Sequence, residues 1–405
     1  MIRFRWLANE TDLRNSAEID YPLMSVSQTK GVIPRSELMG NEGRAESLDN
    51  YKVCISGQIV INRMSASSGA LGLASQGGLV SPDYAVLTPS KLVVPKYLEY
   101  LMRSTWFIGE MVARLKGIGA GGESASVRTP RINISDLGDV LVPLPEFKEQ
   151  LRIVEFLDDQ IRVINTAIDA KIRVLELNDA AYMAQIRKLL NPPEDPAKME
   201  SEEWVTKKVA WLFKTGSGTT PTSDNAEYFE GSIPWVNSGD LNDSIVNASK
   251  TCVSESALID FSALRMYPQG SLLVAMYGAT VGKTGILGMQ ACVNQAVCVL
   301  HGTSELTTEF AHFWFIANRN SLIEQSVGGG QPNINQEIIR RQRISFPASE
   351  SQLRIVREMQ QITNQRKIRS KIVEKSIGLL AEYKDSLITA AVTGYFDRTT
   401  GKKSA

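Results

Sequence analysis

The sequence predicts an α+β protein in which two mixed, β-rich globular domains are joined by two long antiparallel coiled-coil helices, as a tandem repeat with a pseudo-two-fold axis. Two observations support this fold class. The sequence QLRIV occurs at residues 150–154 and again at 352–356, in a chain of 405 residues. Each copy opens a long segment with helical periodicity, and each such segment follows a series of short strand-like runs.

The flanks of QLRIV show that the repeat is not a chance match. Ile-Asn precedes the first copy at residues 132–133 and the second at 334–335, again 202 residues apart. Upstream, residues 57–60 correspond to 270–273 at a spacing of 213. The first half therefore carries about eleven extra residues (213 minus 202), which we place at 117–127 because loops absorb insertions at little cost. The chain is a diverged tandem duplication.

A long helix is predicted after each Pro-containing repeat flank. Residues 146–190 contain no glycine or proline. Their apolar residues recur at steps of three, four or seven, which is the seam of a coiled coil; they are Leu151, Val154, Ile161, Ile168, Ile172, Leu175, Tyr182, Ile186 and Leu189. The second helix repeats the design with Leu353, Val356, Ile362, Val373, Ile377, Leu380, Leu387 and Ala391.

The predicted helices are too long to be covered by one small domain. At about 1.5 Å per residue each spans roughly 65 Å, so the economical solution is for the two seams to pack on each other. The chain returns through a globular domain between them, which favours an antiparallel pair. The predicted segments are a first globular domain at 1–145, a helix at 146–190, a linker at 191–199, a second globular domain at 200–347, a helix at 348–393 and a tail at 394–405.

Each globular part is expected to hold short strands and one helix before its last loop. Residues 53–61 and 270–276 are apolar runs bounded by Gly, Pro, Asn and Ser, which is typical of strands. The helices are expected at 95–115 and 307–325.

Composition narrows the class of protein. The four cysteines show no CxxC spacing, and the chain has only two histidines, which disfavours a structural zinc site or a His-based triad. No apolar run reaches the roughly 20 residues of a membrane span, and the first residues lack the apolar core of a signal peptide. We therefore expect a cytoplasmic protein without a membrane partner.

The duplicated pattern resembles a known family. Ile132-Asn133, Pro145 and the QLRIV sequence precede a long helix, and the set occurs twice. This arrangement resembles the specificity subunit of type I restriction-modification systems. Residues 216–221 (GSGTTP) and 233–241 (IPWVNSGDL) also resemble the opening of a target recognition domain in that family. The resemblance spans essentially the whole chain.

The resemblance implies a DNA-binding protein without catalysis of its own. Each globular domain would be a target recognition domain that reads one half of a bipartite double-stranded DNA sequence, and the helices would set the distance between the halves. Methyltransferase subunits, two being expected, would dock alongside and methylate adenine at N6. Restriction subunits would then cleave unmodified DNA. S-adenosylmethionine, ATP and Mg are expected in these partners, and no cofactor is expected on this chain.

Two segments resemble enzyme motifs, but each departs from its motif at a residue or spacing that the chemistry requires. Residues 191–194 (NPPE) approach the Asn-Pro-Pro-aromatic loop of adenine methyltransferases, but Glu194 has no ring to stack on a flipped base, so a linker is favoured. Residues 278–284 (GATVGKT) have three residues between the glycines where a P-loop has four, which favours a DNA-contacting loop or a hairpin turn. The alternative of another class is a coiled-coil scaffold with duplicated ligand- or protein-binding domains.

Candidate DNA-binding residues are polar or basic and lie in predicted loops. They are Gln28, Lys30, Arg63, Lys116, Arg128 and Arg131 in the first half, and Thr219, Thr220, Asn237, Tyr277, Lys283, Gln331 and Asn333 in the second. Arg63 and Tyr277 have an alternative role in packing at a strand end, and Asn333 has one in a turn or helix cap. Arg152 and Arg354 are candidates for partner docking, with helix capping or packing as the simpler role.

Charge predicts weak DNA binding by the isolated chain. Its 44 Lys and Arg balance 44 Asp and Glu. Residues 191–347 carry 11 Lys and Arg against 16 Asp and Glu, a net charge of −5. Contacts to phosphates require basic surface, so we expect a partner to complete the DNA-binding surface.

Overall fold

The structure, a computed structural model, describes residues 1–15, 21–39, 48–115, 131–192, 203–302, 305–326, 333–397 and 402–403. The described chain combines helices with β-sheets, as the predicted α+β class requires. It divides into two compact units, one formed by Met1–Ile172 with Glu374–Ala405 and the other by Arg173–Val373. Each unit takes part of both long helices, so the units do not coincide with the predicted segments.

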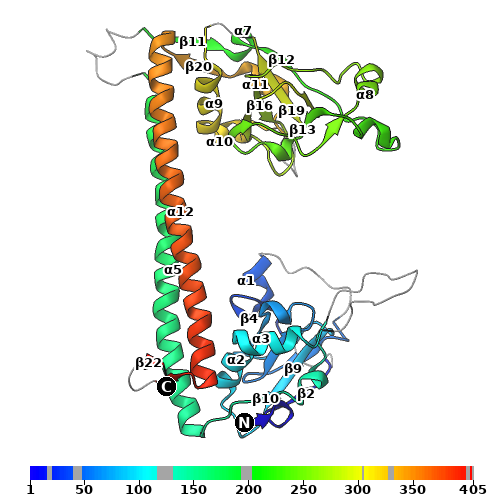
Figure 1. Ribbon diagram of the computed structural model, residues 1–405, viewed down its shortest axis with the longest axis vertical. Helices are drawn as coiled ribbons and strands as arrows, with labels where there is room; N and C mark the ends of the chain where they lie inside the picture. Colours follow the sequence, from blue (N-terminus) through cyan, green and yellow to red (C-terminus); the bar gives the residue numbers. More distant parts are fainter. Residues whose placement is uncertain are drawn as a thin grey trace. The chain divides into compact units, whose positions relative to one another are not determined.

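The two long helices are present. Helix α5 is Phe147–Leu189 and α12 is Ser349–Thr393, drawn in green and in orange to red in Figure 1. Within the second unit, Asn178 Nδ2 donates to Ser370 Oγ (3.1 Å), and four residues later the Tyr182 hydroxyl lies 3.3 Å from Thr363 Oγ1. Later residues of α5 thus meet earlier residues of α12, which makes the helices antiparallel in this unit.

Polar residues of α5 have partners on α12. Arg366 Nε donates to Asp179 Oδ1 at 2.7 Å in the second unit. In the first unit, Lys384 Nζ donates to Asn165 Oδ1 at 3.4 Å. These side chains are partly or largely exposed, so the contacts join the two helices at the rim of the apolar seam. No described helix is both long enough and apolar enough to cross a membrane.

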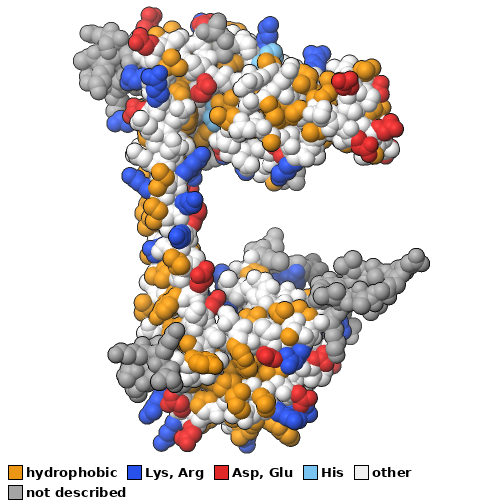
Figure 2. All heavy atoms as spheres, viewed as in Figure 1, with side chains coloured by type: hydrophobic (Ala, Val, Ile, Leu, Met, Phe, Trp, Pro, Cys, Tyr) orange, Lys and Arg blue, Asp and Glu red, His pale blue; other side chains and the backbone are white. Residues whose placement is uncertain are grey.

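The predicted seam is wrong at the start of each helix and at Ile172 in the middle of α5. Of the predicted seam residues, Leu151 and Leu353 are 48% and 49% exposed, and Ile172 is 43% exposed. Ile153 and Leu157 are buried in their place in α5, in the core of the first unit. The first turns pack on a globular core and only later turns face the other helix, so the buried face changes along the helix. Hydrophobic side chains remain exposed on both helices, among them Val163 and Leu177 of α5 and Ile368 and Ile372 of α12, and Figure 2 shows such side chains along the helical pair.

The main sheet of the first unit has the strand order β2-β9-β6-β7, with all neighbours antiparallel. These strands are Ala8–Thr11, Tyr84–Pro89, Ile59–Asn62 and Leu71–Leu73. The predicted strand at 53–61 is instead two strands, because Gly57 takes φ of 88° in a turn between β5 and β6. Three smaller pairs are β1 (Ile2–Arg3) with β10 (Leu141–Val142), β3 (Met24–Ser27) with β4 (Gly31–Pro34), and β5 (Lys52–Cys54) with β8 (Gly78–Val80).

The main sheet of the second unit has the order β12-β19-β16-β17-β14. Its strands are Lys214–Gly216, Val297–His301, Leu272–Ala275, Thr284–Leu287 and Ser244–Val246. A second sheet has the order β15 (Cys252–Val253), β13 (Ile233–Val236), β18 (Cys292–Val293). Strand β11 (Val205–Lys208) pairs with β20 (Arg343–Phe346). Residues 278–283 lie in the connection between the antiparallel strands β16 and β17, so this segment closes a hairpin, one of the two alternatives left open by the sequence.

The two main sheets repeat one pairing register. Ile59 faces Leu87 in the first unit, and Leu272 faces Leu300 in the second. Ile59 and Leu272 are 213 residues apart, and so are Leu87 and Leu300, which is the spacing found in the sequence. Apolar strand residues in the two halves therefore occupy the same places in equivalent cores, and the duplication is structural as well as sequential.

Short helices surround each sheet. In the first unit they are η1 (Phe4–Trp6), α1 (Arg35–Met39), η2 (Ala66–Ser68), α2 (Pro95–Arg103), α3 (Thr105–Val112) and α4 (Ile134–Leu137). In the second they are α7 (Val209–Leu212), η3 (Ala226–Phe229), η4 (Ser238–Asp240), α8 (Glu255–Asp260), α9 (Thr308–Ala317), α10 (Arg319–Glu324) and α11 (Gln336–Arg341). Strands β21 (Phe396–Asp397) and β22 (Lys402–Lys403) pair after α12.

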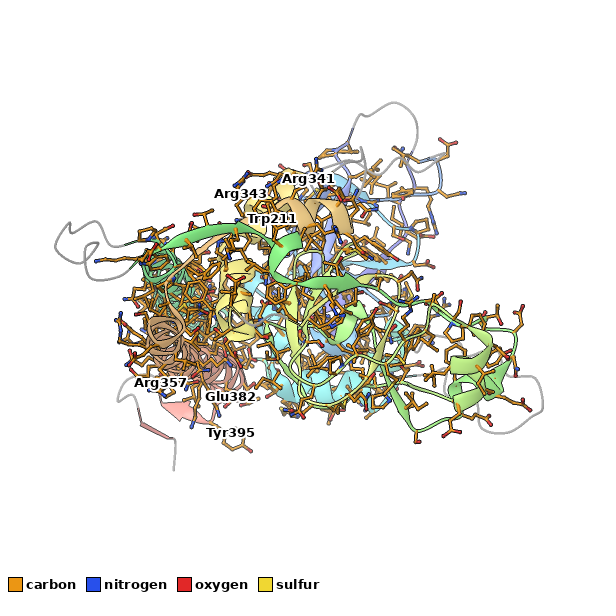
Figure 3. All side chains as sticks on the ribbon, turned by 90° about the horizontal axis from the view of Figure 1, so that it is seen from above. Trp211, Arg341, Arg343, Arg357, Glu382 and Tyr395 are labelled. Atoms are coloured by element: carbon orange, nitrogen blue, oxygen red, sulfur yellow. The ribbon has the colours of Figure 1, made fainter. Side chains whose placement is uncertain are left out.

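Each helix predicted before the last loop is instead two helices. Ser104 separates α2 from α3, since its Oγ accepts a hydrogen bond from Phe107 N (3.2 Å) and caps the second helix. Asn318 likewise stands between α9 and α10. Helix α7 presents Trp211 to solvent, and Figure 3 shows it on the same side as Arg341 and Arg343.

The repeated glutamine explains much of why QLRIV occurs twice. Gln150 is buried; its Oε1 accepts from Val94 N (2.7 Å) and its Nε2 donates to the carbonyls of Leu92 and Pro145 (3.1 and 3.0 Å). Gln352 makes the equivalent bonds to Thr307 N and to the carbonyls of Glu305 and Pro347, all at 2.8–2.9 Å. Each glutamine thus ties the start of a long helix to the N-cap of α2 or α9.

A buried histidine predicts pH-dependent stability of the second unit. Burial lowers the pKa of His312 to about 4, although the charge and backbone of Asp243 act in the opposite direction. Between about pH 6.5 and 4 the unfolded chain binds a proton that the folded chain does not, so stability falls as pH falls through this window. We expect a loss of up to ~3 kcal/mol, at ~1.36 kcal/mol per pKa unit, in thermal unfolding measured from pH 7.5 to 4.5.

The matched variants separate this effect from general acid denaturation. His312→Asn, which does not titrate, should flatten the acid slope. His301→Asn should change it less, because His301 is only partly buried. Equal slopes for wild type and His312→Asn would contradict the prediction.

Candidate functional site

Three predicted residues of the second unit gather around Trp235. The Trp235 Nε1 donates to the Thr219 carbonyl (3.2 Å). Asn237 Nδ2 donates to Thr251 Oγ1 (3.0 Å), and Thr220 Oγ1 donates to Gln295 Oε1. We call Thr219, Thr220, Asn237, Thr251 and Gln295 the Trp235 cluster. It is rich in hydroxyl and amide groups, which both donate and accept hydrogen bonds and so suit the edges of DNA bases.

Asn237 holds its position through a local cap. Its side chain and that of Asp240 form a capping box at η4, in which Asn237 N donates to Asp240 Oδ2 at 2.9 Å. Because the cap fixes the backbone, the Asn237 amide keeps one orientation beside Thr251. Such preorganisation lowers the entropy cost of a contact to a ligand.

Tyr277 and Lys283 lie at the two ends of the β16–β17 connection. Tyr277 packs partly on the core of the second unit, and burial raises its hydroxyl pKa, so it remains protonated at neutral pH. Lys283 Nζ lies 3.5 Å from Asn242 Oδ1. Asn333, which is exposed, is next to Tyr277 because Ile334 N donates to the Met276 carbonyl (2.8 Å). The hydrogen bond from Ile334 to Met276 thus brings Asn333 near Tyr277, while Lys283 lies at the other end of the same connection.

Asp243 and Arg319 fasten the β16–β17 connection. Asp243 adopts the left-handed conformation, with φ of 55°. Its Oδ1 accepts from Thr284 N (3.0 Å), Thr284 Oγ1 (3.1 Å) and Arg319 Nη2, and Arg319 Nε donates to the Gly282 carbonyl (2.9 Å). Burial alone would raise the pKa of Asp243, but the hydrogen bonds from Arg319 and Thr284 outweigh it and hold this pKa below its usual value.

We expect Arg319→Met to loosen this connection. The substitution leaves the half-buried Asp243 carboxylate and the Gly282 carbonyl without the guanidinium, at a cost on the order of 1–3 kcal/mol. Denaturant unfolding should show this loss, and hydrogen exchange should quicken at residues 278–283. Arg265→Met, at an exposed arginine of the same unit, is the control and should change neither. Unaltered exchange in Arg319→Met would refute the fastening role.

Gln28 and Lys30 of the first unit are exposed in the turn between β3 and β4. Ser27 Oγ accepts from the backbone N of Thr29 and of Lys30 (both 3.2 Å), and Arg103 Nη2 donates to the Gln28 carbonyl (2.7 Å). Gly31 takes φ of 71° at the end of the turn. The turn is therefore fixed by its backbone, while both predicted side chains point to solvent.

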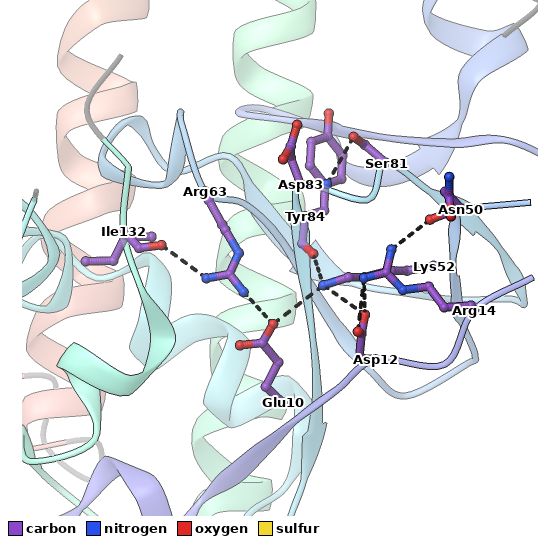
Figure 4. A network of polar contacts seen from close by, with 10 residues as sticks. All are labelled: Glu10, Asp12, Arg14, Asn50, Lys52, Arg63, Ser81, Asp83, Tyr84 and Ile132. Atoms are coloured by element: carbon purple, nitrogen blue, oxygen red, sulfur yellow. Dashed lines mark hydrogen bonds and ion pairs between the residues drawn. The ribbon is translucent and has the colours of Figure 1, made fainter. Parts of the chain in front are cut away.

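Arg63 is held by the protein rather than presented to a ligand. Its Nη2 pairs with Glu10 and its Nη1 donates to the Ile132 carbonyl (3.3 Å), as Figure 4 shows. The same network contains the buried Lys52, whose Nζ donates to the Tyr84 carbonyl (2.9 Å) and lies near Glu10 and Asp12. The packing role allowed for Arg63 thus fits its contacts. Arg131, adjacent to Ile132, is exposed.

Of the remaining predicted residues, two are exposed and three lie outside the described part of the chain. Lys116, Arg128 and Gln331 lie outside the described residues. Arg152 is exposed near the start of α5, with Nη1 3.4 Å from Glu149 Oε2, and Arg354 is exposed near the start of α12. Among the described residues there is no group of three or more His, Cys, Asp and Glu placed to hold a metal ion.

Sequence reasoning missed Gln295, Asn242, Asp243 and Arg319. Gln295 had one available signal, since it is a polar residue in a short loop between two apolar runs. Arg319 gave none, because its contact with Asp243 joins residues 76 positions apart.

A family model, two curated relatives and a solved structure that are similar to this chain come from type I restriction systems. A family model described as the type I restriction modification DNA specificity domain matches residues 201–375. The chain is 24% identical over 159 residues to the specificity subunit of the type I restriction enzyme MjaIX from Methanocaldococcus jannaschii, which covers 38% of this chain and 36% of that protein. It is 22% identical over 233 residues to the EcoR124I/EcoR124II specificity subunit from Escherichia coli, with 55% of each covered.

These matches span about a third to about a half of the curated relatives. A solved structure from a study of complex assembly and conformational transition of the type I R-M system matches over 97% of each chain, with a TM-score of 0.70 and 16% sequence identity. At that identity the match shows a shared fold.

Proposed function

This chain belongs to the specificity subunits of type I restriction-modification systems, and from that premise we propose that it recognises a DNA sequence in two parts, one for each compact unit. The proposal is supported by a shared frame that carries different additions. Both units have the same central strand pairing. The units differ in what joins neighbouring strands: a short turn joins β3 to β4 in the first, whereas the connection from β13 to β15 in the second holds η4 and β14. Two domains that recognise different half-sites need different DNA-contacting surfaces on a common support.

In this proposal the Trp235 cluster and the β16–β17 connection contact DNA in the second unit, and the β3–β4 turn with Arg131 does so in the first. Hydroxyl and amide groups would contact base edges, while Lys30, Arg131 and Lys283 would contact phosphates. Arg63 would position the backbone next to Arg131 instead of touching DNA, because its guanidinium is already paired with Glu10.

Helices α5 and α12 would form an antiparallel coiled coil that sets the distance between the half-sites. The chain itself would carry out no chemistry. Two methyltransferase subunits would bind it and methylate adenine N6 with S-adenosylmethionine, and restriction subunits with ATP and Mg would complete the system. The proposed location is the cytoplasm, where DNA and these subunits meet.

Mapping N6-methyladenine by single-molecule sequencing tests the proposal. A methylation-free host would express the chain with the methyltransferase subunit of the same system, and each protein alone as a control. A split motif with an unspecified spacer, seen only when both proteins are present, is the expected result. Methylation by this chain alone would make it an enzyme. Unmethylated DNA with both proteins soluble and associated would favour the scaffold alternative.

A further inference from the structure

Both halves of the chain expose a tryptophan at the same place in the repeat. Trp6 ends η1 in the first unit and Trp211 lies in α7 of the second. They are 61% and 68% exposed, whereas the residue after each, Leu7 or Leu212, is buried. One exposed aromatic residue is ordinary on a protein surface. The same residue exposed twice in a diverged duplication calls for a common cause.

Backbone contacts establish that the two tryptophans are equivalent. Phe4 N donates to the Val140 carbonyl at 2.9 Å, just before the strand that leads toward α5. Val209 N donates to the Gln342 carbonyl at 2.9 Å, just before the strand that leads toward α12. Each tryptophan therefore occupies the short helical turn after the first strand of its domain, beside the last strand before the long helix.

The QLRIV repeat supplies a second exposed pair. Its glutamine and isoleucine are buried in both copies, which explains their recurrence by folding. Its leucine is half exposed in both copies, as Leu151 and Leu353, and packing within the unit does not account for it. The recurrence of two exposed apolar residues in each half indicates that something outside the chain contacts both halves in the same way.

The surface around Trp211 is basic. Lys208 Nζ lies 5.6 Å from the Trp211 ring centroid, and Lys208 is paired in register with Arg343. Arg341 and Arg343 line an open depression with Gln325, Ile338 and Gln342, and Figure 3 shows both arginines on the side of Trp211. Glu337 is the acidic residue paired with Arg341 there, at 3.7 Å. A partner with an acidic surface would complement this charge.

The corresponding surface of the first unit is more apolar. Leu141 is exposed where the second unit has Arg343, and Arg3 and Arg5 both pair with Asp139. Figure 2 shows hydrophobic side chains gathered around the part of this unit that holds β1 and β10. Each half thus exposes a tryptophan and a leucine at equivalent positions of the repeat, and the charge around the tryptophan differs between the halves.

We propose that Trp6 with Leu151, and Trp211 with Leu353, are docking residues for two copies of one protein partner, the methyltransferase subunit, and that an acidic part of this partner faces Lys208, Arg341 and Arg343. The inference rests on the proposed function and specifies the partner's site on this chain. A common partner explains why the docking residues recur while the rest of each domain diverges.

DNA fits these residues less well. Phosphate contacts use Lys, Arg and hydrogen-bond donors, to which the exposed leucines contribute nothing. Two different half-sites also give no reason for the same exposed residues in both units. Protein interfaces, by contrast, are enriched in Trp and Arg at the positions that dominate binding energy.

Native mass spectrometry of the full chain with the methyltransferase subunit, in the absence of DNA, tests the inference. Wild type should bind two copies. Trp6→Ala and Trp211→Ala should each retain one copy tightly and bind the other roughly 30-fold more weakly, and the double variant should bind neither tightly. Arg343→Glu should weaken only the copy lost in Trp211→Ala. Ile259→Ala, at an 81% exposed residue of α8, is the matched control and should bind two.

Each outcome decides the inference. Two tightly bound copies in both tryptophan variants would overturn it while leaving the proposed function intact. Unchanged methyltransferase binding with weaker DNA binding by the assembled complex would assign the surface to DNA and also overturn it. A wild-type chain that binds no methyltransferase would overturn the inference together with the proposed function. Thermal unfolding of each variant confirms that the lost copy reflects the surface and not unfolding.

Discussion

Gln352→Met is expected to destabilise the second unit by about 3 kcal/mol or more, because three backbone groups lose their partner at once. Methionine matches glutamine in length but offers no amide to Thr307 N or to the carbonyls of Glu305 and Pro347. Each buried group left unsatisfied costs ~1–3 kcal/mol. Since domains are stable by only ~5–15 kcal/mol, the loss should be evident in denaturant unfolding.

The repeat supplies both a replicate and a control for this prediction. Gln150→Met should destabilise the first unit in the same way, since Gln150 makes the equivalent three bonds. Arg152→Met changes an exposed residue of the same sequence whose ion pair with Glu149 is worth little, so it should shift stability by less than ~0.5 kcal/mol. If either glutamine variant were as stable as Arg152→Met, the buried hydrogen bonds would not be the reason that QLRIV recurs.

Four residues inserted into α5 near Ile172 should abolish methylation at the original sites and create a new motif with a longer spacer. The insertion lengthens the helix by about 6 Å, against ~3.4 Å per base pair along one DNA strand, so one or two base pairs are expected. Four residues are close to one helical turn, so the side chains beyond the insertion turn by only about 40° and keep facing α12. N6-methyladenine mapping reports the motif.

The half-sites make this prediction specific. They should keep their sequences, because no residue of the Trp235 cluster or of the β3–β4 turn is changed. A four-residue exchange at the same place, without a change in length, controls for the altered sequence and should leave the spacer as it was. An unchanged spacer in the insertion variant would show that α5 does not set the distance between the half-sites.

The sequence located most of the frame. Both long helices begin and end within two residues of their predicted limits. The repeat spacing of 213 recurs in the register of the two sheets. The errors in the limits of the predicted elements fall where the chain turns within them, at Gly57, Ser104 and Asn318. A glycine conformation decides the turn at Gly57 and a side-chain cap decides the one at Ser104, and apolar periodicity reports neither.

The candidate site was less accessible to sequence reasoning. The sequence indicates that polar loop residues such as Asn237 and Lys283 are of types suited to DNA contacts. It does not indicate which of them lie close together in the folded chain. Arg63 has the same chemistry as Arg131, yet Glu10 and the Ile132 carbonyl hold it within the domain. Nothing local in the sequence distinguishes these two arginines, because their partners come from distant segments.

What the sequence by itself determined is the duplicated frame with its long helices, because repeated spacing and helical periodicity are properties of neighbouring residues along one chain. Only the tertiary structure decided which repeated residues serve folding and which remain at the surface. Gln150 and Leu151 are adjacent and both recur, yet one is buried by three hydrogen bonds and the other faces solvent. The physical reason is that burial depends on what distant segments place over a residue, and those contacts leave no trace in local pattern.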